Sequence, residues 1–233
     1  MDGTGKLFES FVENLGAIDF QIINFPEIGA QDYNSLAKTV SETLPSNEYI
    51  ILAESFSGPL ASNIVQEKNI HLKGIIFVTS FLSAPNRLAL SIARFAPLKF
   101  LTRLPFSNLI QRHFMLGSNA TKKCLSNFQS VVSSVPSKVL KARIKTMLNL
   151  VKPEFSSDLP VVYLSGDKDR LVPKSKIKEF ENCFQNFTHK EISGPHFLLQ
   201  ACPESASRAV LESISLLTSQ TSQGRNTACS APV

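Results

Sequence analysis

The stretch Tyr49–Ala61, which reads YIILAESFSGPLA, decides the fold. It begins as a run of strand-forming residues and ends as small residues that open an apolar helical pattern. Ser55 lies at the junction, and small residues stand two positions before and after it, Ala53 and Ser57. A strand, a sharp turn and a helix in this order form an elbow that presents a serine hydroxyl at the end of a sheet. A serine that caps a helix gives a similar pattern, so the stretch alone leaves both interpretations open.

Predicted strands and helices alternate on both sides of this elbow. The strands are expected over residues 18–25, 48–53, 73–79, 159–166 and 187–192, and the helices over residues 3–15, 33–44, 57–69, 174–184 and 203–217. The strands are continuous apolar runs, which is typical of strands that helices cover on both faces. We therefore expect an α/β fold with a mostly parallel sheet flanked by helices.

The alternation breaks at about Phe81, and this break defines the domains. Residues 82–155 contain no clear strand and several prolines, among them Pro85 and Pro136. We predict an inserted helical cap there, within a core formed by residues 1–81 and 156–218. Residues 219–233 are polar, and we predict a disordered tail for them.

The composition is that of a globular protein, with 43% hydrophobic and 18% charged residues among 233. No apolar run is long enough to cross a bilayer. The four cysteines (Cys124, Cys183, Cys202 and Cys229) have neither the spacing of a disulfide framework nor that of a metal site. These features favour a reducing, cytoplasmic setting.

Charge is unevenly distributed along the chain. Residues 81–155 carry twelve Lys and Arg residues against the single acidic Glu154, so this segment has a formal charge of +11 and the remainder of −6. Such asymmetry indicates a basic face for an anionic partner: an acidic carrier protein, a lipid surface or a charged substrate. A merely solvated helical face is the alternative. No recognition motif points to nucleic acid.

An acid and a histidine follow two later strands. The stretch GDKDRLVP (Gly166–Pro173) comes after the strand at 159–166, and SGPHF (Ser193–Phe197) comes after the last strand. Reactive groups gather at the carboxyl ends of parallel strands. A serine nucleophile needs a base, and the base needs an acid to orient it. The sequence therefore offers Ser55 as the nucleophile, Asp167 or Asp169 as the acid and His196 as the base, in this order along the chain.

These motifs together resemble those of the α/β-hydrolase superfamily, in particular small capped carboxylesterases, lipases and serine aminopeptidase-like hydrolases. The stretch GDKDRLVP is similar to the acid loop G-x-x-D-x-x-V-P, which implies Asp169 as the acid. His196-Phe197-Leu198, followed by Cys202-Pro203-Glu204, resembles the histidine segment. Asp2-Gly3-Thr4-Gly5 resembles the oxyanion loop. The likeness runs from Asp2 to about Leu217, with possible loss of N-terminal strands, since relatives have a strand before this loop and the sequence begins on it.

The resemblance implies roles for six residues. Ser55 is the expected nucleophile, His196 the base and Asp169 the acid that orients it. Backbone N–H groups of Phe56 and of the first loop, at Met1 or Asp2, are expected to stabilise the oxyanion. No metal or organic cofactor is implied.

Three functions are compatible with these residues. The first is a serine hydrolase that cleaves a small-molecule carboxylic ester or thioester through an acyl-enzyme. The second is an acyltransferase that uses the same site. The third is a catalytically silent hydrolase-fold binding protein. Glu54 stands beside the nucleophile, where many relatives carry His or Gln, and we expect it to line the pocket or bond a loop backbone.

Overall fold

Four parallel strands form the sheet of the computed structural model, which describes residues 1–67, 69–95, 107–118 and 120–228. The strands are β1 (Tyr49–Glu54), β2 (Leu72–Val78), β3 (Val161–Gly166) and β4 (Phe187–Ile192), and they lie in the order β1-β2-β3-β4. The predicted α/β fold with a parallel sheet is confirmed.

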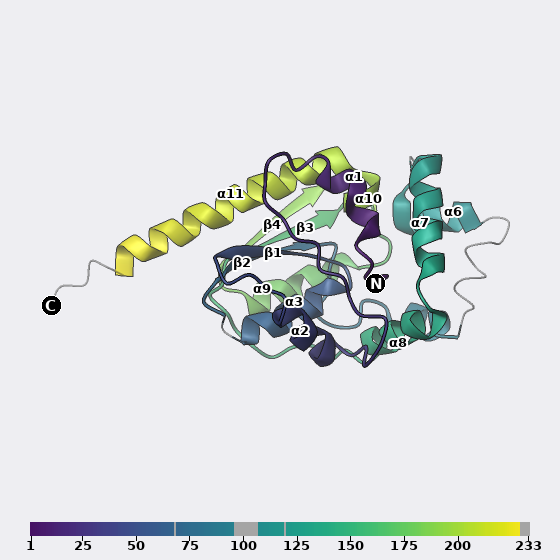
Figure 1. Cartoon of the computed structure of the whole chain (residues 1–233), viewed down its shortest axis with the longest axis horizontal. Coiled ribbons are helices and arrows are strands. Elements are labelled where there is room, and N and C mark those ends of the chain that lie inside the picture. The colour runs from purple at the N-terminus through teal and green to yellow at the C-terminus, as the bar shows by residue number, and fades with distance from the viewer. Residues whose placement is uncertain (68, 96–106, 119, 229–233) are drawn as a thin grey trace.

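Helices cover both faces of this sheet (Figure 1). They are η1 (Lys6–Phe8), α1 (Glu9–Val12), α2 (Tyr33–Ser41), α3 (Ser57–Gln66), α4 (Arg87–Ala93), α6 (Ser107–Gln111), η2 (Arg112–Leu116), α7 (Lys122–Ser134), α8 (Ser137–Leu148), η3 (Lys174–Lys176), α9 (Ile177–Cys183), α10 (Leu198–Ala201) and α11 (Pro203–Ala228). Successive side chains of β2 point to opposite faces. Phe77 packs with α2, α3 and α9, and Val78 packs with α1, α10 and α11. Both faces are therefore buried, as the continuous apolar strands predict.

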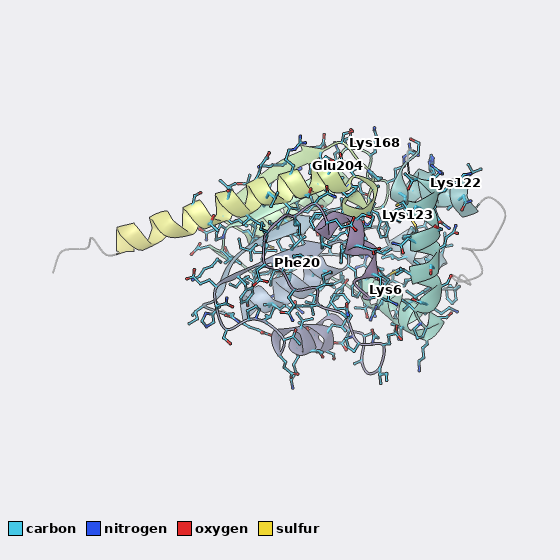
Figure 2. All side chains as sticks on the ribbon, turned by 45° about the horizontal axis from the view of Figure 1, so that its top comes forward. Lys6, Phe20, Lys122, Lys123, Lys168 and Glu204 are labelled. Carbon is cyan, nitrogen blue, oxygen red and sulfur yellow. The ribbon has the colours of Figure 1, made fainter. Side chains whose placement is uncertain are left out.

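Residues 18–25 do not form the predicted strand. A strand needs a neighbour to receive its backbone hydrogen bonds. In this segment the Phe25 N–H instead donates to the Gly3 carbonyl at 2.8 Å. Phe20 and Ile22 are 48% and 38% exposed, and Phe20 lies on the surface in Figure 2. Their apolar character led to the wrong prediction.

The two ends of the chain also differ from expectation. The first helix begins at Lys6, not at residue 3, because Gly3 and Gly5 have φ angles of 73° and 72°, outside the helical region. At the other end, α11 continues to Ala228, through most of the segment predicted to be disordered. A helix that is already anchored extends with little further cost per residue. Residues 229–233, with Cys229, lie outside the described residues.

The secondary-structure elements that the structure describes between β2 and β3 are all helices, from α4 to α8. Figure 1 shows α6 and α7 beside the sheet core, beyond the carboxyl ends of the strands. Residues 96–106 and 119 of the predicted cap lie outside the described residues. We keep the name cap for residues 82–155. Among the described helices, none combines the length and apolar character needed to cross a membrane.

Candidate active site

Ser55 lies at the turn between β1 and α3, with an unusual backbone conformation. Its φ angle is 50°, in the left-handed region that residues other than glycine rarely adopt. The Ser55 N–H donates to the Val78 carbonyl at 2.9 Å. The Ser55 carbonyl accepts from the Ser80 Oγ at 2.8 Å and from the Gly58 N–H at 3.1 Å. These three hydrogen bonds hold the serine in its strained conformation.

Close packing around the elbow, residues 53–58, explains its small residues. Ala53 is 1% exposed, within the core. The tightest approach is at Gly58, where an added Cβ would lie 1.8 Å from the Ser80 Oγ. The requirement for a small residue is therefore strongest three positions after Ser55, one position beyond Ser57.

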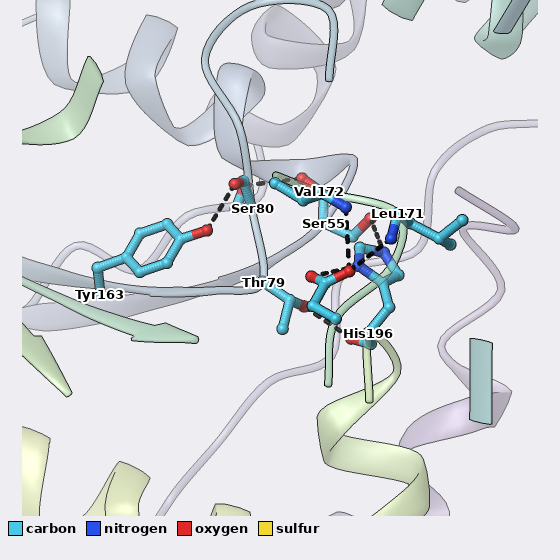
Figure 3. Close-up of polar contacts among 8 residues, drawn as sticks. Ser55, Thr79, Ser80, Tyr163, Leu171, Val172 and His196 are labelled. Carbon is cyan, nitrogen blue, oxygen red and sulfur yellow. Dashed lines mark hydrogen bonds and ion pairs between the residues drawn. The ribbon is translucent and has the colours of Figure 1, made fainter. Parts of the chain in front are cut away.

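His196 meets Ser55 from the loop between β4 and α10. Its Nε2 lies 2.8 Å from the Ser55 Oγ, and its side chain is buried. The Thr79 Oγ1 donates to the His196 carbonyl at 2.8 Å, and the Phe197 N–H donates to the Met115 carbonyl at 3.0 Å. The end of β2 (Figure 3) and the cap thus hold the histidine loop in place.

Asp169 lies on the other side of the imidazole, in the loop after β3. Its Oδ2 is 2.9 Å from the His196 Nδ1. Its Oδ1 accepts hydrogen bonds from the N–H groups of Leu171 and Val172 at 2.8 and 3.0 Å (Figure 3). Because a carboxylate only accepts, the Nδ1 carries the proton. The Nε2 of a neutral ring is then free to accept the hydroxyl proton of Ser55.

Asp167, the other acid that the sequence allows, does not contact the imidazole. It is exposed, and its Oδ1 accepts from the Gly194 N–H at 2.8 Å. Its Oδ2 accepts from the Ser193 Oγ at 3.3 Å. Asp167 therefore supports the loop that carries His196, and Asp169 is the acid beside the ring.

The two segments predicted to stabilise an oxyanion are both firmly held. Phe56 is fully buried, and its ring centroid lies 4.9 Å from that of Tyr33. Among the described residues, the Phe56 N–H has no hydrogen-bond acceptor. The carbonyls of Met1 and Asp2 accept from the Arg143 Nη1 at 2.9 and 2.6 Å. The roles of Phe56, Met1 and Asp2 as donors stay predictions.

Sequence reasoning missed Arg143, which is fully buried on α8. A signal was present: this arginine stands on the apolar face of its helix, beside Val139, Leu140, Ile144 and Met147. A lone cation at such a position indicates a buried polar partner. Its partner on the distant segment before α2, Gln31, carries no comparable signal.

Glu54 bonds a side chain, whereas the sequence led us to expect that it lines the pocket or bonds a loop backbone. Its Oε2 accepts from the Gln200 Nε2 at 2.9 Å. Its Oε1 is buried and has no hydrogen-bond partner among the described residues. Burial raises the pKa of Glu54 to about 7, although Gln200 and His196 act in the opposite direction. This carboxyl can therefore change its charge near neutral pH.

The described residues contain no group of three His, Cys, Asp or Glu side chains that could hold a metal ion. Cys124, Cys183 and Cys202 are free thiols. The polar groups gathered around Ser55 are thus a hydroxyl, an imidazole and carboxylates, a set that suits nucleophilic catalysis.

Comparison with known families identifies the chain. The model of the family described as serine aminopeptidase, S33 (Hydrolase_4) matches residues 25–194, which is most of the sequence. The chain belongs to this family of α/β-hydrolases. The matched part includes Ser55 and Asp169 and ends two residues before His196.

Solved structures support the family's fold for this chain. An esterase from Exiguobacterium antarcticum superposes with a TM-score of 0.73 at 12% identity, over 93% of this chain and 88% of that one. A thermophilic esterase from Thermogutta terrifontis gives 0.69 at 15% identity, over 92% and 86%. A bromoperoxidase from Bacillus anthracis gives 0.71 at 14% identity, over 91% and 88%. No curated protein matches the sequence.

Proposed function

We propose that this α/β-hydrolase cleaves a carboxylic ester or thioester with an apolar acyl group. One observation carries the proposal: the Ser55 Oγ, the His196 ring and the Asp169 carboxylate form one hydrogen-bonded line, with distances of 2.8 and 2.9 Å. This is the arrangement that a serine nucleophile, its base and the orienting acid require.

The proposed reaction has two halves. In the first, the Ser55 Oγ attacks the acyl carbonyl while the His196 Nε2 takes its proton. The same proton then passes to the leaving alcohol or thiol as its bond to the carbonyl carbon breaks, and an acyl-enzyme remains. In the second half, water loses a proton to His196 and attacks the acyl group. The carboxylic acid is released and Ser55 recovers its proton.

Asp169 stabilises the charged imidazole in both halves. Its two backbone hydrogen bonds, from Leu171 and Val172, fix the direction of the carboxylate. The negative oxygen of each tetrahedral intermediate is assigned to the Phe56 N–H and to the backbone at Met1 and Asp2. Loss of one such donor typically raises the barrier by roughly 3 kcal/mol.

The substrate in this proposal is a small acyl ester, held between the core and the cap. The cap supplies apolar side chains such as Leu116 and Phe128, beside the histidine loop. Its excess of basic residues would attract an anionic carrier or lipid surface. The free thiols at Cys124, Cys183 and Cys202 support a reducing, cytoplasmic setting.

A fluorophosphonate probe tests the proposal, because it reacts with an activated serine. We expect labelling at Ser55, mapped by mass spectrometry, and hydrolysis of p-nitrophenyl esters. Ser55→Ala should abolish both. Ser57→Ala is the matched control, since it removes a hydroxyl two residues further on, at the start of α3, and should leave both intact.

Labelling that persists in Ser55→Ala, or a folded wild-type protein that neither labels nor hydrolyses any ester or thioester, would contradict the proposal. The second result would favour a catalytically silent binding protein. Product analysis with added alcohols separates the remaining alternative, because an acyltransferase would form a new ester in place of the free acid.

A further inference from the structure

A buried arginine of the cap binds the backbone of the first loop. The Arg143 Nη1 donates to the carbonyls of Met1 and Asp2 at 2.9 and 2.6 Å. Its Nη2 donates to the Pro26 carbonyl at 3.0 Å, and its Nε donates to the Gln31 Oε1 at 2.9 Å. All four acceptors are uncharged. In the described part of the chain, no carboxylate lies within ion-pair distance of this guanidinium.

The burial of an unpaired guanidinium is costly unless its N–H groups are satisfied. Burial lowers the pKa of Arg143, although Asp2 and Glu27 favour its charged form. An arginine nevertheless stays protonated in proteins. Its charge is therefore balanced by carbonyl dipoles, and hydrogen bonds from a charged donor are stronger than neutral ones. Arg143 therefore holds its four acceptor oxygens more tightly than a neutral donor would.

Because the peptide bond is planar, the hydrogen bonds from Arg143 to these carbonyls also fix the direction of the N–H groups that follow them. The Met1 carbonyl and the Asp2 N–H belong to one peptide unit and point in opposite directions. When Arg143 binds the Met1 oxygen, it therefore sets the direction of the Asp2 N–H. The bond to the Asp2 oxygen does the same for the Gly3 N–H.

The same arginine connects this loop to the residue after the nucleophile. The guanidinium lies 5.6 Å from the ring centroid of Phe25, whose N–H donates to the Gly3 carbonyl at 2.8 Å. The Phe25 ring lies 6.0 Å from that of Phe56. Gly3 has a φ angle of 73°, and a Cβ there would lie 2.6 Å from the Arg143 Nη1. The loop, Arg143 and Phe56 are therefore packed as one unit.

We propose that Arg143 is a positioning residue, which directs the Asp2 N–H toward the substrate oxyanion, opposite the Phe56 N–H. The inference rests on the proposed function. It gives the cap a second task besides enclosing the acyl group, because α8 supplies the side chain that shapes the oxyanion site.

Arg143→Lys tests the proposal, because it keeps the positive charge but cannot reach four acceptors at once. We expect kcat to fall by about 10²- to 10³-fold, as for the loss of an oxyanion donor. The affinity for a trifluoromethyl ketone, which forms a tetrahedral adduct with the serine, should fall by a similar factor. KM should change by less than about threefold, since the ground-state contacts remain. In Arg143→Ala, added ethylguanidinium should restore part of kcat.

Thr146→Val is the matched control for a purely structural effect. Thr146 lies one turn along α8, and its Oγ1 donates to the Gln31 carbonyl at 3.0 Å without touching the first loop. It should lower the melting temperature and leave kcat within about twofold. If the Arg143 variants do not fold, Gly3→Ala provides a second test. Its added Cβ would collide with the Arg143 Nη1 and so displace the first loop. It should give the same loss of kcat and of ketone affinity.

The outcomes separate the inference from the proposed function. If the wild-type protein shows no turnover that depends on Ser55, both fall. If turnover depends on Ser55 but folded Arg143→Lys and Gly3→Ala keep their kcat, the inference alone is wrong. It is also wrong if kcat falls while the ketone affinity is unchanged, or if Thr146→Val lowers kcat as much.

Discussion

Glu54 accepts a hydrogen bond of 2.9 Å from the Gln200 Nε2, while its own Oε1 and the Gln200 Oε1 are buried without hydrogen-bond partners among the described residues. The pKa of Glu54 is raised by burial to about 7, from an ordinary value of 4.5. Between these two pH values the folded protein keeps a proton that the unfolded chain has lost. The free energy of unfolding therefore falls as the pH rises through this range.

Glu54→Gln should remove this pH dependence, because an amide does not ionise. Its new N–H can also donate to the Gln200 Oε1. We expect the free energy of unfolding of Glu54→Gln to exceed that of the wild type by more at pH 8 than at pH 4.5. The difference between the two pH values should reach up to about 3 kcal/mol. Urea denaturation at both pH values measures it. Glu181→Gln, an exposed acid on α9, is the control, and parallel pH profiles for wild type and Glu54→Gln would contradict the prediction.

The two neighbouring acids should behave differently when each is changed to asparagine. Asp169→Asn loses the acceptor that fixes the His196 tautomer, so we expect kcat to fall by about 10⁴-fold with little change in stability. Asp167→Asn weakens only the support of the histidine loop, and kcat should stay within about tenfold. Steady-state kinetics of both variants decides between them. A larger loss for Asp167→Asn would mean that the proposed acid is the wrong one.

Gly58→Ala should destabilise the protein through a collision with Ser80. The added Cβ would lie 1.8 Å from the Ser80 Oγ and 3.1 Å from the Phe81 carbonyl. Overpacking of this kind costs roughly 1–3 kcal/mol. Ser80→Ala removes the colliding oxygen, so the double variant should be less destabilised than the sum of the two single ones. Additive free energies of unfolding would show that the two positions are not in contact.

Salt should weaken the binding of anionic substrates if the basic cap attracts them. We expect KM for an acyl thioester with a phosphorylated leaving group to rise several-fold between about 0.02 and 0.5 M salt. KM for a neutral ester should not change. Replacing both Lys122 and Lys123, which are exposed at the start of α7 (Figure 2), by Gln should reduce this salt dependence, and Lys178→Gln on α9 should not. Equal salt dependence for both substrates would indicate a solvated face.

Position along the sheet made much of the candidate site predictable. Ser55, Asp169 and His196 each follow a strand that can be recognised in the sequence. Parallel strands bring such positions to one edge. Predicting that these three residues meet required only the correct order of strands, not the details of side-chain packing. The same reasoning failed for residues 18–25, because an apolar run says nothing about whether a neighbouring strand exists.

Buried polar partners were not predictable in the same way. Arg143 and Gln31 are 112 positions apart, and nothing local pairs them. The bond from the Tyr163 hydroxyl to the Ser80 carbonyl, at 2.7 Å, depends on the neighbouring positions of β2 and β3 in the sheet. Such pairs are set by tertiary packing, which leaves only a weak trace in each segment.

The side chains of Ser55, Asp169 and His196 come from loops that are far apart in the chain, and this has a consequence during synthesis. Ser55 emerges from the ribosome early, and His196 emerges only after β4 has been made. Without a base, a serine hydroxyl is a poor nucleophile. The growing polypeptide therefore carries an inert serine, and its proposed reactivity begins only when the last strand joins the sheet.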